Sequence, residues 1–311
     1  MLREIIIYTL YSSLTEAIDT DYIEKAKETD HELDFTQIFQ YSKMTTIIAL
    51  YNESVFTHIE PDLANESYLL ACLSSAVSVV DLNKGTAWAI AGLPARQGYK
   101  EGIGTEAEFH TIVSLAQINK TMLIISDQYN NCLRWIDRST HQTSPFAGSC
   151  GDDRLKGDIG DSEQPVTDLI FTQPGALLYN DTSKVLYAAD YDEVLRINMT
   201  TNTAQRHFKS PKVITGLTAA GSRLLASYSK GVLQIESVDG STLLTGINAG
   251  HDDHHVDVDN LNETVFDNLA DIQLLYQNIY VLAEYGRHLI RGIDLKRCVV
   301  VCVSFRRHPT V

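Results

Sequence analysis

The sequence predicts an all-β fold: a β-propeller with six blades, the first of them irregular, or with five blades. Three observations predict it: a repeated Ala-Gly pair, a repeated acidic strand end followed by an arginine, and four short strand-like segments in each repeat. The chain has 311 residues, of which 44% are hydrophobic. Blades of about 40–60 residues would account for nearly all of this length.

The Ala-Gly pair and the acidic strand end followed by an arginine each recur along the chain. Ala-Gly pairs stand at residues 91–92, 147–148 and 249–250, so that their glycines are 56 and 102 residues apart. The second repeat spans residues 125–137 and 282–294 without a gap, with a shorter copy at 188–198 and weaker copies at 70–81 and 225–236. A unit of roughly 50 residues fits a propeller blade and not a helical solenoid.

Each unit is expected to fold as four antiparallel strands, because alternating and β-branched residues are separated by Asp, Asn, Gly and Ser turns. Hairpins between second and third strands are predicted near residues 68–82, 122–137, 185–198, 223–236 and 279–294. Residues 35–50 resemble the last hairpin of one more unit, and residues 5–11 could supply an earlier strand of it. Six blades are therefore favoured over five.

The two ends are read separately from the repeats. Residues 1–34 are expected to form an N-terminal strand and an acidic insert or linker, residues 35–305 the propeller, and residues 306–311 a tail. Residues 1–17 have some features of a signal peptide. A strand rich in Ile and Tyr is the favoured interpretation, because Tyr, Thr and Ser interrupt the apolar stretch.

The best-preserved unit resembles a known family. After Ala91-Gly92 come the run 98–109, Gly-Tyr-Lys-Glu-Gly-Ile-Gly-Thr-Glu-Ala-Glu-Phe, and the run 126–137, Ser-Asp-Gln-Tyr-Asn-Asn-Cys-Leu-Arg-Trp-Ile-Asp. These resemble an NHL-repeat β-propeller, closely over 91–148 and less closely over 148–208 and 249–305. The resemblance implies the fold but no single activity, because the family includes enzymes, RNA binders and protein-binding modules.

Charge and hydropathy exclude two classes of partner. The chain has 40 acidic against 25 basic residues, a formal net charge of −15. Binding through nucleic-acid phosphates needs a basic surface, so no nucleic acid is expected as a partner. No apolar run approaches the roughly 18–20 residues that span a bilayer, so no transmembrane segment is expected.

Two of the five cysteines are predicted to pair. Cys132 begins the third strand of its unit, Cys150 follows the fourth, and the turn between these strands centres near residues 140–141. Folding about that turn places Cys132 opposite Ser149, next to Cys150, within the Cα separation of about 4.4–6.8 Å that a disulfide needs. The alternative is two free thiols at a blade edge. Cys72 is expected to be a small core residue.

Asn-x-Ser/Thr sequons indicate the compartment. Six are present, at Asn52, Asn65, Asn119, Asn180, Asn198 and Asn262. Together with the disulfide they predict a secreted, glycosylated chain in the extracellular space or secretory pathway. The alternative is that three of them only serve turn geometry, since Asn65, Asn119 and Asn180 occupy the same turn in three units.

One face of the propeller is predicted to bind a partner. The loops between second and third strands open on the same side as the links between blades, and such loops often carry function. The candidate binding residues there are Tyr99, Lys100, Glu101, Asp127, Tyr129, Asn130, Asp190, Tyr191, Asp192, Glu284, Tyr285 and His288. The alternative for Asp127 and Asp190 is that they bond loop backbone amides.

Metal chemistry is the second functional prediction. The run 251–259 is rich in His and Asp, and His251, Asp253 and His255 would project to one side of an extended segment as ligands for a divalent metal. A solvated surface loop is the favoured alternative. No nucleophile elbow, phosphate loop or His-Glu-x-x-His motif occurs. The sequence thus favours a non-enzymatic extracellular module that binds a protein or glycan, with a metal-dependent lyase or hydrolase on the propeller axis as the alternative.

Overall fold

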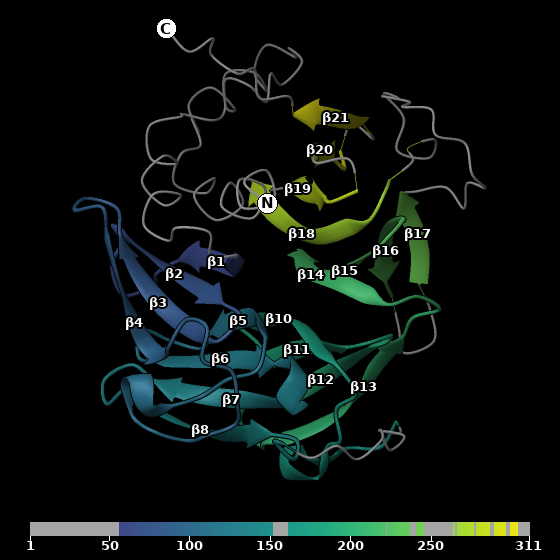
Figure 1. Cartoon of the computed structure of the whole chain (residues 1–311). Helices are drawn as coiled ribbons and strands as arrows, with labels where there is room; N and C mark the ends of the chain where they lie inside the picture. Colours follow the sequence, from purple (N-terminus) through teal and green to yellow (C-terminus); the bar gives the residue numbers. More distant parts are fainter. Residues whose placement is uncertain are drawn as a thin grey trace, which may run out of the picture.

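A computed structural model describes residues 56–151, 161–221, 223–236, 241–245, 264, 266–276, 278–286, 289–296 and 299–303 (Figure 1). The predicted N-terminal segment 1–34, the predicted extra hairpin at 35–50 and the tail 306–311 lie outside these residues. So do the metal cluster at 251–259, Asn52, Asn262 and His288.

The described strands form five antiparallel sheets, each a blade with strands in chain order. Blade 1 comprises β1 (Phe56–Pro61), β2 (Tyr68–Leu73), β3 (Ala76–Asp81) and β4 (Thr86–Gly92). Blade 2 comprises β5 (Ile112–Gln117), β6 (Met122–Asp127), β7 (Cys132–Asp137) and β8 (Gln142–Ala147). Blade 3 comprises β10 (Pro174–Asn180), β11 (Val185–Asp190), β12 (Glu193–Asn198) and β13 (Thr203–Lys209), with the short β9 (Gln164–Pro165) added at its outer edge.

Blade 4 comprises β14 (Ile214–Ala220), β15 (Arg223–Tyr228), β16 (Gly231–Ile235) and β17 (Ser241–Thr245). Blade 5 comprises β18 (Leu269–Tyr276), β19 (Ile279–Glu284), β20 (Leu289–Asp294) and β21 (Val299–Val303). Three single 3₁₀ turns interrupt the links and loops: η1 (Gly104–Glu106), η2 (Gln128–Asn130) and η3 (Val166–Asp168).

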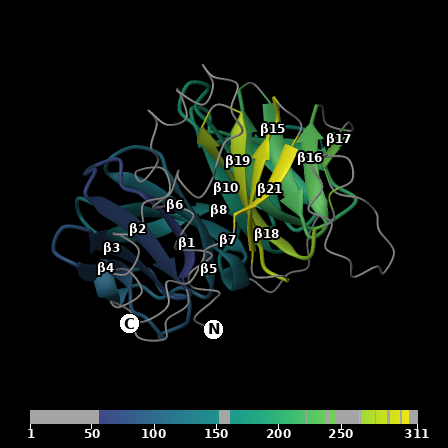
Figure 2. The ribbon, with the colours of Figure 1, turned by 90° about the horizontal axis from the view of Figure 1, so that it is seen from above.

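The blades surround a central axis, as the prediction of a β-propeller requires. Figure 1 looks along this axis, with the first strands β1, β5, β10, β14 and β18 innermost and the fourth strands outermost. Successive first strands contact each other from β1 through β18. In the perpendicular view of Figure 2, blades 1 and 2 lie on one side and blades 4 and 5 on the other. The all-β fold and the five predicted second-to-third-strand hairpins are confirmed. The described residues hold five blades, and the predicted irregular first blade falls outside them.

Buried side chains fill the spaces between neighbouring blades. Alternation along each strand sends one set of side chains to each face of its sheet. The interface of blades 2 and 3, for example, buries Leu133, Phe146, Leu186 and Leu195, each at most 7% exposed. Cys72 is fully buried in β2, as predicted, and burial raises the pKa of its thiol. The propeller core is therefore divided among blade interfaces and not gathered in one cluster.

The Ala-Gly repeat has a packing cause. Gly92 and Gly148 end the fourth strands of blades 1 and 2 with φ of +74° and +83°, which only glycine adopts freely. A Cβ at Gly92 would lie 2.8 Å from the Phe109 ring, and one at Gly148 would lie 2.6 Å from the Phe171 ring. Both rings are buried in the link to the next blade. Because each glycine lacks a Cβ, the aromatic ring of the following link can pack directly against the end of the preceding blade.

The shorter copy of the second repeat has a different register from the one that the sequence suggests. Arg134 on β7 pairs with Ile125, two residues before the acid Asp127. At the same place in blade 3, Ala188 pairs with Leu195 and not with Arg196. The loop between β11 and β12 is two residues shorter, so the expected match of Arg196 to Arg134 is wrong by one residue. In a strand, one residue moves the side chain to the opposite face.

Candidate functional site

The two ends of the propeller differ in what they present. In a meander of antiparallel strands, the second-to-third-strand loops and the interblade links share one end, which we call the loop face. The first-to-second and third-to-fourth turns share the other end, which we call the turn face. Backbone bonds such as Tyr129 N to His110 O and Tyr285 N to Asn268 O join loops to links on the loop face.

An acidic residue ends the second strand in blades 2, 3 and 5 and holds the incoming link. Asp127 accepts the backbone N–H of His110 at 2.7 Å, and Asp190 accepts that of Gln173 at 2.6 Å. Glu284 accepts the N–H of Asp267 at 2.7 Å. All three carboxylates are fully buried. Asp127, Asp190 and Glu284 therefore bond backbone amides of the incoming links, as the alternative for Asp127 and Asp190 proposed, and their contact with a partner stays a prediction.

In blade 2 a buried arginine forms an ion pair with this carboxylate. The Arg134 guanidinium lies 2.9 Å from Asp127 Oδ2 and donates to the backbone oxygens of Lys100 and Glu108 at 2.7 and 2.6 Å. It also stacks 4.4 Å above the Phe109 ring. Arg134 thus joins the strand, the acid and the interblade link in one buried network. We call this network the Arg134 latch.

Blade 5 repeats this arrangement. Arg291 Nε lies 2.7 Å from Glu284 Oε2, both side chains are buried, and the guanidinium lies 5.8 Å from the Phe266 ring. Blade 3 keeps the acid and Phe171 but has Leu195 in place of the arginine. The repeated acid and arginine of the sequence are therefore explained by link anchoring.

The predicted disulfide is present beside the Arg134 latch. Cys132 and Cys150 are bonded, with their Cα atoms 5.0 Å apart. Gly151 N donates to Asn130 O, which ties the residue after the disulfide to the same loop. The link leaving blade 2 is thereby covalently joined to the start of β7.

Four of the predicted binding residues are exposed tyrosines on the loop face. Tyr99, Tyr129, Tyr191 and Tyr285 have exposed fractions of 43%, 57%, 46% and 42%. They come from the link between blades 1 and 2 and from the second-to-third-strand loops of blades 2, 3 and 5; Tyr99 and Tyr129 share one blade junction, because the blade 2 loop is bonded to that link. Large exposed aromatic rings on a rigid frame are typical of binding surfaces.

The remaining predicted binding residues have mixed surroundings. Lys100 is exposed, while the Glu101 carboxylate lies 3.0 Å from the Arg134 guanidinium. Asn130 is buried and donates to Gly98 O and Asp127 Oδ2. Asp192 is partly exposed and lies 3.7 Å from Lys209 Nζ. Among these described residues, the carboxylates of Glu101 and Asp192 thus each lie close to a basic side chain.

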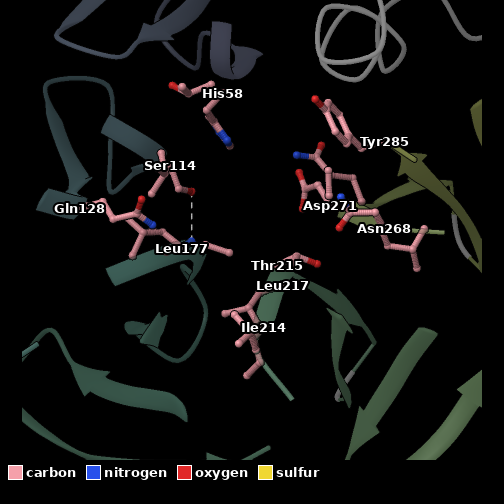
Figure 3. A pocket seen from close by; sticks show the side chains of 18 residues that line it. His58, Ser114, Gln128, Leu177, Ile214, Thr215, Leu217, Asn268, Asp271 and Tyr285 are labelled. Atoms are coloured by element: carbon pink, nitrogen blue, oxygen red, sulfur yellow. Dashed lines mark hydrogen bonds between the residues drawn. The ribbon is translucent and has the colours of Figure 1, made fainter. Parts of the chain in front are cut away.

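A cavity of about 460 Å³ opens along the propeller axis, lined by all five first strands. Figure 3 shows His58 entering it from blade 1, Ser114 and Gln128 from blade 2, and Asp271, Asn268 and Tyr285 from blade 5. Ile214 and Leu217 supply an apolar side, with Thr215 between them. Tyr285 and Gln128 belong to loops of the loop face, so the cavity continues from that face.

A β-bulge in every first strand shapes the cavity. Register shifts occur at Phe56/His58, Ile112/Ser114, Pro174/Leu177, Ile214/Gly216 and Leu269/Asp271. Bulges bend a strand and redirect the next side chain, and they are frequent beside functional sites. The residues that follow the bulges of blades 1, 2, 4 and 5, His58, Ser114, Gly216 and Asp271, therefore occupy equivalent positions around the axis, whereas Leu177 of blade 3 lies one residue further along its strand.

Two titratable groups face each other across this ring. Burial raises the pKa of Asp271 to about 6, and the His58 charge and the hydrogen bonds from Ile272 and Gln273 only partly oppose it. Burial lowers the pKa of His58, but Glu60 and Asp271 outweigh burial and raise it overall. Glu60 Oε2 lies 3.8 Å from His58 Nε2. Neither His58 nor Asp271 was predicted from the sequence, although Asp271 is the one charged residue of its largely apolar strand.

The turn face carries all four sequons of the described residues. Asn65, Asn119 and Asn180 lie at first-to-second-strand turns, and Asn198 lies at a third-to-fourth-strand turn. Their Oδ1 atoms accept backbone N–H groups, for example those of Ser67 and Thr121 at 2.9 Å. These bonds use the amide oxygen, whereas N-glycosylation uses the nitrogen. The turn role and the acceptor role are therefore compatible.

Within the described ranges, no three His, Cys, Asp or Glu side chains are grouped as metal ligands. In the same part of the chain, no helix has the length and apolar character needed to cross a bilayer. His251, Asp253 and His255 lie outside the described ranges, and their metal binding remains a prediction.

Fold and site together define a β-propeller with a polar cavity on its axis. No family model and no curated protein sequence matches the chain. Among solved structures, the chain is similar to one in a nidogen/laminin complex, with a TM-score of 0.54 and 11% identity over 79% of this chain and 83% of that one. It is also similar to an auxiliary nutrient binding protein from Bacteroides thetaiotaomicron, with a TM-score of 0.54 and 10% identity over 78% of this chain. That second match spans 56% of the bacterial protein. At these identities the likeness concerns the fold alone.

Proposed function

We propose that this protein is an NHL-type propeller that works as an extracellular binding module and recognises a protein on its loop face. The observation that carries the proposal is the set of four exposed tyrosines on the loop face, Tyr99, Tyr129, Tyr191 and Tyr285, of which Tyr285 also lines the axial cavity. Tyrosine is enriched among the residues that dominate protein interfaces, because its ring buries much area at little entropic cost.

The scaffold beneath the tyrosines supports this proposal. Buried acids anchor the links in three blades, and the Cys132–Cys150 disulfide holds the loop that carries Tyr129. A preorganised surface loses less conformational entropy on binding than a mobile one. The nidogen/laminin complex provides a precedent by analogy for a similar propeller in a protein complex.

Compartment and glycosylation support the same orientation. A disulfide favours an oxidising compartment. Glycans on Asn65, Asn119, Asn180 and Asn198 would cover the turn face and leave the loop face bare. The net charge of −15 argues against nucleic acid as the partner. A glycan partner is the alternative, since tyrosine rings also stack on sugars.

A paired set of variants tests the loop face. The loop variant carries Tyr129→Ser, Tyr191→Asn and Tyr285→Ser; Asn is used at residue 191 because its φ of +57° suits Asn. The control variant carries Leu63→Ser, Trp88→Ser and Leu243→Ser, which are exposed apolar residues away from the loop face. Multimerised wild-type protein is screened against displayed extracellular protein domains and, in parallel, against a glycan array.

We expect a protein ligand whose affinity falls about tenfold or more for the loop variant and is unchanged for the control variant. Equal binding by both variants would contradict the loop face as the site. Binding confined to the glycan array would replace the protein partner with a glycan. Mass spectrometry before and after glycosidase treatment of protein from a eukaryotic host tests the compartment, with occupancy expected at several of the sequons.

A further inference from the structure

We propose that the axial cavity is a binding site for a small organic ammonium compound, whose N–H groups donate to the carboxylate of Asp271. The cavity opens from the loop face and shares Tyr285 with the tyrosine surface, but Asp271 lies on a first strand inside it. Its volume of about 460 Å³ is in the range of small-molecule sites, and it combines an apolar side with a few convergent polar groups.

The position of Asp271 depends on a glycine in the neighbouring blade. Asp271 Oδ1 accepts the backbone N–H of Ile272 at 2.8 Å. A Cβ at Gly216 would lie 2.2 Å from this same oxygen and 2.8 Å from Ser227 Oγ. Gly216 follows the bulge of β14 as Asp271 follows that of β18. The absence of a side chain on one strand thus creates the room in which the carboxylate of the next strand sits.

The carboxylate has unused capacity for a positive partner. Unlike Asp127, it pairs with no arginine or lysine of the described residues. A buried carboxylate without a cation is costly, and a bound cation offsets that cost. Apart from His58, the other polar side chains that line the cavity are neutral amides and hydroxyls: Thr57, Ser114, Gln128, Thr215, Asn268, Gln273 and Tyr285.

His58 does not take the place of that cation. Its Nε2 lies 3.8 Å from Glu60 Oε2, so it has a carboxylate of its own on the adjacent side. Its Nε2 makes no hydrogen bond to any described residue. His58 and Asp271 thus stand on different sides of the same space, as Figure 3 shows. A ligand in that space would contact both.

The lining also indicates what kind of ammonium fits. Primary and secondary ammonium groups have N–H donors for a carboxylate, whereas a quaternary ammonium has none and relies on an aromatic cage. Among the described lining residues, the only aromatic ring apart from the imidazole is that of Tyr285, at the loop-face end. The neutral amides and hydroxyls suit further hydroxyl or amide groups on the ligand.

Ligand-observed NMR and calorimetry on the full chain at neutral pH test the site. The probes are primary and secondary amines from ethanolamine to spermidine, their N-acetylated forms, and carboxylates of matched length. Binding of at least one amine is expected, with affinity about tenfold or more above that of its acetylated form, because acetylation removes the charge. This arm uses wild-type protein and needs no variant to fold.

Asp271→Asn keeps the size of the side chain and removes its charge, and it should lower amine affinity about tenfold. The matched control Asp192→Asn removes a loop-face carboxylate outside the cavity and should leave it unchanged. The proposal is overturned if no amine binds, if carboxylates bind better than amines, or if Asp271→Asn binds as wild type does. These assays contain no protein partner, so their failure would leave the loop-face proposal standing.

Discussion

Asp127 and Asp271 are both carboxylates in the strands of a blade, but Asp127 is fully buried and Asp271 is partly exposed at a cavity. Asp127 receives hydrogen bonds from the His110 amide and the Asn130 side chain and an ion pair from Arg134. Asp271 receives hydrogen bonds from the Ile272 amide and the Gln273 side chain, has no ion pair with an arginine or lysine of the described residues, and faces a cavity. The first carboxylate is closed by the protein, and the second is left open.

This difference separates a structural acid from a candidate binding acid. A buried carboxylate whose acceptor positions are all used holds chain segments together and offers nothing to a ligand. A carboxylate with unused acceptor positions at the edge of a cavity can bind a ligand, because a donor or cation on the ligand would fill those positions.

The largest expected effect on stability comes from removing the arginine that pairs with Asp127. Arg134→Met removes the guanidinium and leaves the buried Asp127 without its cation, which should destabilise the protein by about 3–5 kcal/mol. Arg196→Met is the matched control, because Arg196 is only partly buried and is not the equivalent of Arg134; its effect should be within about 0.5 kcal/mol. Urea unfolding of both variants measures the difference. Similar losses in the two would disprove the importance of the Arg134 latch.

The disulfide beside the closed site should have the next largest effect. Replacing Cys132 and Cys150 by serine removes a cross-link across 18 residues, which should cost about 3 kcal/mol. Unfolding in the presence and absence of a reductant checks it. The reductant should bring the wild-type protein close to the variant and leave the variant itself unchanged. If the reductant destabilised both proteins equally, the cross-link would not be the cause.

The smallest of the three effects concerns the open site and depends on pH. The pKa of Asp271 is about 6 in the folded protein against an ordinary value of 3.8, so the folded state binds this proton more tightly than the unfolded state. Its stabilising contribution is complete below pH 3.8 and is lost as pH rises through about 6. Wild-type stability relative to Asp271→Asn should thus fall by about 2 kcal/mol between these pH values. If the free energies of unfolding of the two proteins changed with pH in parallel, the pKa of Asp271 would not be raised in the folded state.

The parts of this molecule that follow from short stretches of chain were predictable. The hairpins match because alternation and turn residues act locally. The Cys132–Cys150 disulfide follows from folding one hairpin about its turn. The exposed tyrosines follow from their loops, since a loop between the second and third strands has one possible end of the blade to occupy.

The register of the shorter repeat and the burial of the acids at the strand ends were harder to predict from the sequence. Arg196 looked equivalent to Arg134, but a loop shorter by two residues moved Leu195 into that place. Asp127, Asp190 and Glu284 were considered as surface acids, although amides from links earlier in the chain enclose them. Such bonds join segments about 17 residues apart, so inspection of either segment alone does not reveal them.

By itself, the sequence determined the repeating strand pattern, the closed arrangement of blades and the residues of the exposed loops, because these depend on local periodicity and turn chemistry. Only the tertiary structure decided which carboxylates are enclosed by hydrogen bonds and ion pairs of the protein and which one faces the cavity. His58, Gly216 and Asp271 belong to three blades and meet only when the blades close around one axis. The five bulges then turn these residues toward the same space. Contacts of this kind depend on the geometry of ring closure, which no local pattern records.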